Sequence, residues 1–212
     1  MIHAYSKNYL DDARLTLAAA FDYAVNDLDI KLCDFYDVFM NSELGHKFER
    51  GYYGVISGMS GIELTNKVLK KKKFKDPTPR YDYTKKSVEY WVGDVLAYYQ
   101  WYTGLTFKEI ASFITIDNIR RMYNPYHEMD ITHFCDRLNE LYKETYPDTK
   151  LKTLRKNIGL TQKELSIYSD IPLRTIQQYE QRQKNINKAQ GEYLIKLSKA
   201  LNCKIEDLLE KI

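Results

Sequence analysis

Near the C-terminus, two short helical patterns are joined by a turn that allows few geometries. Thr161 precedes Glu164 by three residues, the spacing of a capping box in which each side chain accepts a backbone N–H from the other residue. The helix that follows is expected to end before Ile171-Pro172. Because proline has a fixed φ and no amide hydrogen, Pro172 suits the start of a next helix, over 173–180. The pattern therefore predicts a helix-turn-helix.

The residues around this pattern resemble the Cro/phage-repressor helix-turn-helix family, also called the xenobiotic-response-element family. The matching segments are 154–156, 159–165, 171–180 and, for the family's fourth and fifth helices, 194–201 and 205–209. The resemblance implies a five-helix, lambda-repressor-like DNA-binding domain over 150–212. It implies a sequence-specific regulator of transcription that binds double-stranded DNA, as a repressor or an autoregulator.

The resemblance also assigns roles to single residues. The helix 173–180 is expected in the major groove, with base contacts from Leu173, Arg174, Thr175 and, one turn later, Gln178. Arg174 can pair with guanine and Gln178 with adenine, whereas Leu173 can touch only a thymine methyl group or the sugar. Phosphate contacts, which give affinity and little sequence information, are expected from Gln162, Gln177, Gln181, Lys184, Asn185 and Lys188.

Other residues of this domain are expected to be structural. The resemblance implies an internal ion pair between Arg155 and Glu180, the alternative being that they contact DNA. Arg174 has its own alternative as a solvated surface arginine. The expected core residues are Leu165, Ile171, Ile176, Leu194, Leu197 and Leu201.

Two departures from the family pattern bear on the phosphate contacts. Gln181-Arg182-Gln183 stands where the family often has a small residue and a glycine, and the connection 184–192 is longer than usual.

Charge is distributed unevenly along the chain. Residues 150–212 carry 13 Lys and Arg against 7 Asp and Glu, a net +6, whereas residues 1–149 carry 19 against 22, a net −3. A basic segment attached to a mildly acidic one indicates that the C-terminal part meets a polyanion.

Residues 1–146 are predicted to form a separate helical domain, joined by a linker at 147–149, in a chain that is all-α. Apolar periodicity and capping residues predict helices over 7–26, 31–40, 43–50, 87–102, 116–123 and 130–144, and others that start at the capping boxes Ser60–Glu63 and Thr106–Glu109. In these helices Val38 is expected to face inward and Glu89 to face solvent. Asn124-Pro125 is expected to stop a helix. The run from Lys70 to Lys75 reads as a solvated loop, or alternatively as a nonspecific DNA contact.

Several function classes find no support in the residues. No glycine-rich phosphate loop, nucleophile elbow or metal-binding spacing is present, and His127 and His133 lie six residues apart across an expected helix start. Cys33, Cys135 and Cys203 are expected to be free thiols packed as small hydrophobes. We therefore expect no catalytic residues, no metal and no cofactor, and treat an enzyme as the least favoured hypothesis.

The sequence contains no apolar run long enough to cross a membrane, and its first ten residues lack the core of a signal peptide. A cytoplasmic protein with no membrane partner is expected.

The role of the N-terminal domain has two alternatives. Its aromatic run 98–102 is more typical of a core or a protein interface than of a ligand cage. The architecture of the whole chain resembles antitoxin-like helix-turn-helix proteins, which implies that the first domain binds a protein partner while the C-terminal domain autoregulates the operon.

For the whole protein, the leading hypothesis is a DNA-binding regulator that acts as a homodimer and reads two half-sites about 34–36 Å apart.

Overall fold

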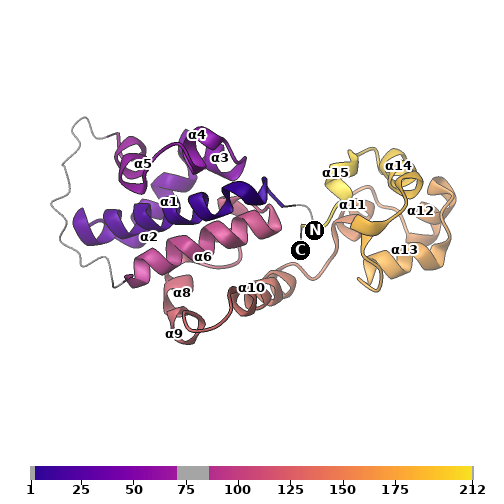
Figure 1. The fold of residues 1–212 in the computed structure, drawn as a ribbon. Coiled ribbons are helices and arrows are strands. Elements are labelled where there is room, and N and C mark those ends of the chain that lie inside the picture. The colour runs from indigo at the N-terminus through magenta and orange to yellow at the C-terminus, as the bar shows by residue number, and fades with distance from the viewer. Residues whose placement is uncertain (1–2, 71–85, 212) are drawn as a thin grey trace. The chain divides into compact units, whose positions relative to one another are not determined.

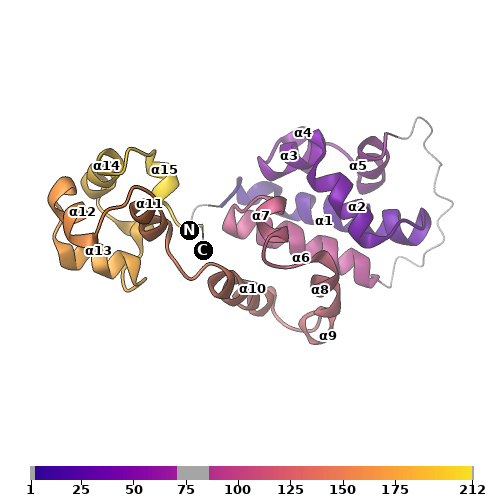
Figure 2. The ribbon, with the colours of Figure 1, turned by 180° about the vertical axis from the view of Figure 1, so that it is seen from behind.

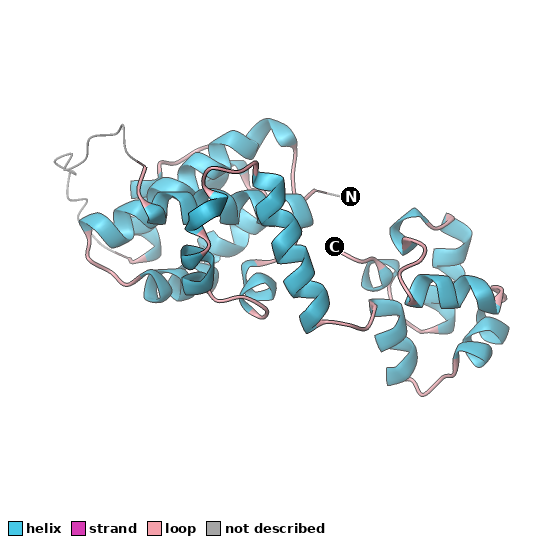
Figure 3. Ribbon diagram, turned by 90° about the horizontal axis from the view of Figure 1, so that it is seen from below, coloured by secondary structure: helices cyan, strands magenta, loops and turns pink. Residues whose placement is uncertain are grey.

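The computed structural model describes residues 3–70 and 86–211, and in this part of the chain every regular element is a helix (Figure 3). The all-α fold predicted from the sequence is confirmed. The chain divides into two compact units, an N-terminal unit, Met1–Tyr142, and a C-terminal unit, Lys143–Ile212. Each unit is described by itself.

The N-terminal unit is built on two helices that pack along each other, α1 (Leu10–Asp22) and α6 (Val88–Thr103) (Figure 1). Their backbones approach so closely at Gly93 that an added Cβ would lie 2.6 Å from the Leu17 carbonyl oxygen. The apolar face of α1, which includes Leu17 and Phe21, is buried.

Further helices lie around this pair, and the view from behind also shows α7 (Figure 2). They are η1 (Lys7–Tyr9), the π-helical turn Tyr23–Asp27, α2 (Leu32–Met40), α3 (Glu43–Glu49), α4 (Tyr53–Ile56), α5 (Gly61–Val68), α7 (Phe107–Ala111), α8 (Ile116–Arg121), α9 (Tyr123–Tyr126) and α10 (Ile131–Thr145). Their core includes five fully buried phenylalanines, Phe21, Phe35, Phe39, Phe48 and Phe107.

The predicted helix starts are mostly confirmed. Thr106 and Glu109 form the complete capping box at the start of α7. At α5 only half of the predicted box is present: the Ser60 hydroxyl accepts the Glu63 N–H at 3.2 Å, but the Glu63 carboxylate turns to Lys67, 2.6 Å away. An i,i+4 ion pair has replaced the second capping bond.

Two expectations about orientation are wrong. Glu89 is 5% exposed, where solvent exposure was expected, because its carboxylate accepts a hydrogen bond from Arg120 Nε at 2.7 Å. Val38 is 44% exposed, and Tyr36 takes the inward position of α2 with its hydroxyl donating to the Phe107 carbonyl at 2.9 Å. In each case a hydrogen bond to a distant segment decides which face is buried. The periodicity of apolar residues within one helix does not reveal such a partner.

The aromatic run of α6 is largely core. Tyr99 and Trp101 are buried, while Tyr98 and Tyr102 are partly exposed and stack on each other. At the predicted stop, Asn124 leaves helical geometry (φ −93°, ψ 126°), as a residue before proline commonly does.

The C-terminal unit contains α11 (Lys150–Asn157), α12 (Gln162–Ser169), α13 (Leu173–Glu180), η3 (Ile186–Lys188), α14 (Gly191–Ala200) and α15 (Ile205–Leu208). Its core residues are Leu151, Leu165, Ile171, Ile176, Tyr179, Ile186, Leu197, Leu201 and Leu208. The predicted core is confirmed, with Leu194 half-buried against it.

Cys33, Cys135 and Cys203 are free, and burial raises the pKa of the Cys135 thiol to about 12. Within residues 3–70 and 86–211, no group of three or more metal-ligating side chains is present. His127 instead stacks on Tyr123, with ring centroids 4.0 Å apart. In the same ranges, no helix has the length and apolar character needed to cross a membrane. Positions 71–75 of the lysine run lie outside the described residues.

Candidate nucleic-acid interface

The two helices of the predicted helix-turn-helix are held by side-chain to backbone hydrogen bonds. Thr161 Oγ1 accepts the Glu164 N–H at 3.2 Å and Glu164 Oε2 accepts the Thr161 N–H at 2.7 Å, which confirms the capping box of α12. Hydrogen bonds to the carboxylate from the backbone N–H and the side chain of Thr161 lower the pKa of the Glu164 carboxyl. In the turn, the Ser166 hydroxyl donates to the Ile171 carbonyl at 2.6 Å, and α13 starts directly after Pro172. The turn between the helices is therefore closed locally.

Helix α13 has one buried face and one exposed face. Ile176, Tyr179 and Glu180 are buried against the unit. Since α-helical residues advance about 100° each, the opposite side carries Arg174, Gln177, Gln178 and Gln181. Arg174 and Gln181 are exposed, and Gln177 and Gln178 are partly exposed. Of the predicted base-contacting residues, Arg174 and Gln178 thus share the outer face.

The other two predicted base-contacting residues lie differently. Leu173 and Thr175 are half-buried, at the flanks of the exposed face of α13. They can contact a duplex only where it reaches the edge of this face.

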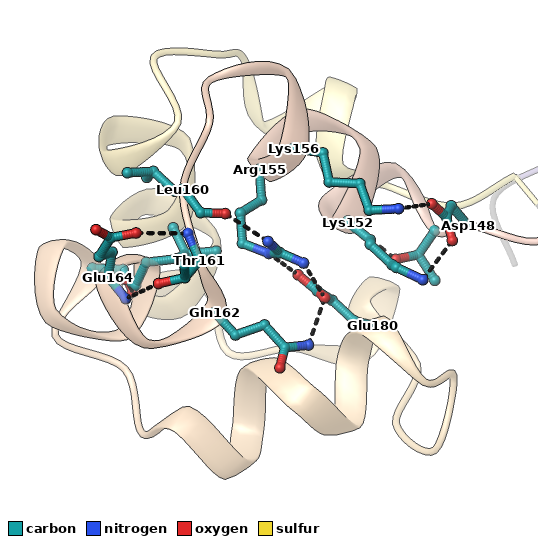
Figure 4. A network of polar contacts seen from close by, with 12 residues as sticks. Asp148, Lys152, Arg155, Lys156, Leu160, Thr161, Gln162, Glu164 and Glu180 are labelled. Carbon is teal, nitrogen blue, oxygen red and sulfur yellow. Dashed lines mark hydrogen bonds and ion pairs between the residues drawn. The ribbon is translucent and has the colours of Figure 1, made fainter.

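A buried ion pair holds α13 on the side opposite its exposed face (Figure 4). Glu180 accepts hydrogen bonds from Arg155 Nε at 2.7 Å and from Arg155 Nη2 at 2.9 Å. Arg155 Nη1 also donates to the Leu160 carbonyl at 2.6 Å. The expected internal pair is confirmed, and the alternative that these two residues contact DNA is not supported by their burial.

Gln162 joins the same network. Its Nε2 donates to Glu180 Oε2 at 2.7 Å, so the amide at the start of α12 is oriented by a residue of α13 (Figure 4). One hydrogen of that amide, and its oxygen, face no partner in this network. The phosphate contact expected from Gln162 stays a prediction, and the sequence did not reveal this internal bond.

The cations of the unit fall into two groups. Lys152 and Lys156 both pair with Asp148, and Lys196 pairs with Asp170 and Glu192. By contrast, within the described residues no carboxylate is paired with Arg174, Lys184 or Lys188, nor with Lys163 in α12, which the sequence reasoning did not single out. Lys150, Lys199 and Lys204 likewise have no carboxylate partner within the described residues, so a free cation is not by itself a mark of the helix-turn-helix.

The glycine that the family often has after the third helix is replaced by an arginine with a local role. Arg182 has a left-handed backbone, with φ of 56°. Its guanidinium donates to the carbonyls of Pro147 at 2.7 Å, Tyr146 at 3.2 Å and Asp148 at 3.5 Å. The end of α13 is thereby tied to the chain that enters α11.

The remaining predicted phosphate contacts lie in the same connection. Gln181, Lys184, Asn185 and Lys188 are all exposed. The side-chain oxygen of Asn185 accepts the Asn187 N–H at 2.9 Å, so only its amide nitrogen is left for a phosphate.

Comparison with known proteins supports this reading of the C-terminal unit. A family model described as Helix-turn-helix matches residues 151–208, from α11 to α15. The match confirms the predicted Cro/repressor-type helix-turn-helix and indicates a DNA-binding transcription regulator. No curated protein and no solved structure matches the chain.

Proposed function

We propose that this protein is a sequence-specific regulator that binds double-stranded DNA through α13 and represses transcription, including that of its own gene. The observation that carries the proposal is the outer face of α13, where Arg174 and Gln178 project from a helix fixed by the Arg155–Glu180 pair. A regulator must reach the chromosome, so the proposal also places the protein in the cytoplasm.

In the proposed complex, α13 lies in the major groove. The planar fork of Arg174 donates to O6 and N7 of a guanine, and the Gln178 amide donates to and accepts from an adenine. Thr175 and Leu173, at the flanks, supply contacts with a thymine methyl group or the sugar. Because Arg174 has no carboxylate partner within the described residues, it needs to break no ion pair to reach a base.

Affinity in this complex comes from the backbone of the duplex. Gln162, Gln177 and Gln181 donate to phosphates from amides, and Lys184 and Lys188 neutralise phosphate charge and release counterions. Asn185 adds a donor in the same connection. These contacts set the register of α13 and leave sequence discrimination to Arg174 and Gln178.

We further propose that the protein acts as a homodimer. One α13 helix covers only a few base pairs, and known helix-turn-helix dimers join two half-sites separated by one turn of the duplex, about 34–36 Å. The expected operator is a near-palindrome.

The proposal is tested by electrophoretic mobility shift with the DNA upstream of the protein's own gene, and by selection of bound duplexes from a random pool. We expect a shift that survives excess unrelated duplex, and a selected sequence with two inverted half-sites. Equal binding to every duplex, with no enriched sequence, would contradict a sequence-specific regulator.

A further inference from the structure

The N-terminal unit has a groove of about 510 Å³ that the DNA-binding proposal does not use. Its lining residues come from η1, the end of α3 and the start of α4, and are Tyr9, Lys47, Arg50, Gly51, Tyr52 and Tyr53. The three tyrosines are 41%, 51% and 66% exposed, whereas the phenylalanines of the neighbouring core are fully buried. Clustered exposed aromatic side chains commonly mark an interaction site.

The backbone holds the groove in a defined shape. Helix α3 ends in a Schellman motif, in which the Gly51 N–H donates to the Phe48 carbonyl and the Tyr52 N–H to the Lys47 carbonyl, each at 2.9 Å. Gly51 has a φ of +68°, and a Cβ there would lie 2.4 Å from Tyr5. Only glycine adopts this φ without strain and has no Cβ to clash with Tyr5. The residues on either side of Gly51 therefore project from a fixed turn.

The groove is cationic as well as aromatic. Lys47 Nζ lies 5.7 Å from the centroid of the Tyr52 ring and also pairs with Glu43 at 2.7 Å. Arg50 is exposed, and within the described residues no carboxylate is paired with it. No carboxylate is among the lining residues, although residues 1–149 carry a net charge of −3. Arg50 therefore gives the groove one unpaired positive charge, whereas the charge of Lys47 is balanced by Glu43.

We propose that this groove docks a short acidic segment of a protein partner, with a large apolar side chain of that segment lying on Tyr52 and Tyr53 and a carboxylate meeting Arg50. Tyrosine and arginine are the residues most enriched at the energetic centres of protein interfaces. Charge complementarity selects the acidic partner.

A single-stranded nucleic acid also favours aromatic rings and cations, but Arg50 is the one lining cation without a carboxylate partner in the described residues, and one such charge is too few to neutralise successive phosphates. A short peptide meets only the groove. The inference does not depend on DNA binding.

The test uses the full-length chain. Short random peptides displayed on phage are selected on the immobilised protein, and enriched peptides are synthesised, labelled and titrated by fluorescence anisotropy. We expect enriched sequences that combine several carboxylates with an aromatic or large aliphatic residue. We expect Tyr53→Ala and Arg50→Ala each to weaken their binding by about tenfold or more, the scale of an interface hot spot.

Two control variants match these changes away from the groove. Tyr168→Ala removes a tyrosine that is 67% exposed in α12, and Arg121→Ala removes an exposed arginine at the end of α8. Both are expected to bind the peptides as the wild type does. Because all four side chains are exposed, unchanged circular dichroism checks that each variant folds.

Three results would overturn the proposal. The first is a selection that yields no peptide whose binding depends on Tyr53 and Arg50. The second is enrichment of peptides without carboxylates. The third is tighter, Tyr53-dependent binding of a short oligothymidylate, which would make single-stranded nucleic acid the occupant. Duplex DNA binding is measured on Tyr53→Ala and Arg50→Ala and is expected to stay unchanged, so failure of this inference is separable from failure of the proposed regulator.

Discussion

The carboxylate of Glu180, in the last turn of α13, accepts two hydrogen bonds from the guanidinium of Arg155 in α11, at 2.7 and 2.9 Å. Both side chains are buried, and Gln162 of α12 donates to the same carboxylate at 2.7 Å. One acidic group therefore links the three helices on which the DNA-binding proposal depends. The orientation of the exposed face of α13 rests on this link.

Removal of one partner of this pair is expected to be costly. Glu180→Ala leaves the Arg155 charge buried without a counter-ion, which costs about 3–5 kcal/mol in comparable pairs. The double variant Arg155→Met, Glu180→Leu removes both charges and is expected to recover most of that loss. Native-state hydrogen exchange of the Ile176 amide in the full chain measures both. A loss below about 1 kcal/mol in Glu180→Ala would show that the pair contributes no more than an exposed one.

Arg182 combines an unfavourable backbone with favourable hydrogen bonds. Arg182→Ala keeps the left-handed φ and loses the three carbonyl contacts, so we expect it to lose more stability than Arg182→Gly. Arg182→Gly also loses the contacts but relieves a backbone cost of about 1–2 kcal/mol. In thermal unfolding, the alanine variant should have the lowest melting temperature, below those of the wild type and the glycine variant. An alanine variant as stable as the glycine variant would contradict the strain at this position.

Lys184 and Lys188 are expected to contribute affinity without sequence preference. Each Lys→Ala change should weaken binding to specific and unrelated duplexes by the same factor, and lower the slope of log K against log salt by about 1. Titrations at several salt concentrations measure the slope. Lys152→Ala, which removes a lysine paired with Asp148, is the matched control and should leave the slope unchanged. A changed preference between duplexes in Lys188→Ala would assign that residue to the bases.

We expect the carboxyl group of Asp148 to make the stability of the folded protein depend on pH in acid. Hydrogen bonds from Lys152 and Lys156 lower the pKa of its carboxyl from 3.8 to about 2. Because the folded-state pKa is below the unfolded one, the stabilisation is present above pH 4 and disappears as the pH falls toward 2. Asp148→Asn should remove this part of the pH dependence, and high salt should weaken it, since the carboxylate is partly exposed. Equal acid sensitivity of the variant and the wild type between pH 4 and 2 would contradict the assignment.

The local signals of the sequence were sufficient for much of the C-terminal unit. The capping box Thr161–Glu164 and the turn at Pro172 were predicted because the residues that form them are neighbours in the chain. The Arg155–Glu180 pair joins residues far apart in the chain, and it was predicted through the family resemblance alone.

Contacts between distant segments explain what was missed. Glu89 was expected in solvent because its partner Arg120 lies 31 residues away, and periodicity says nothing of such a partner. Helix α4, Tyr53–Ile56, was not predicted because it contains Gly54 and its four residues are too few for a periodic pattern. The groove beside it depends on the meeting of η1 with the end of α3, which no single segment encodes.

In the candidate site, the sequence placed Arg174 and Gln178 on the outer face of α13, but it did not show that Leu173 and Thr175 lie at the flanks of that face or how neighbouring groups hold the helix. Gln162 and Arg182 have long side chains with several rotatable bonds. Their hydrogen-bond partners, Glu180 and three backbone carbonyls, are therefore set by the fold. Arginine after α13 was a departure from the family pattern, and that departure was the one signal that could have pointed to a local role.

The most direct test of the account is the specificity of the double variant Arg174→Ala, Gln178→Ala. The ratio of its dissociation constants for the selected operator and for an unrelated duplex is measured by anisotropy at fixed salt. Each lost base contact is worth about 1–3 kcal/mol of discrimination, so the ratio should collapse toward one while binding to the unrelated duplex is nearly retained. An operator preference equal to that of the wild type would contradict the claim that the outer face of α13 reads DNA.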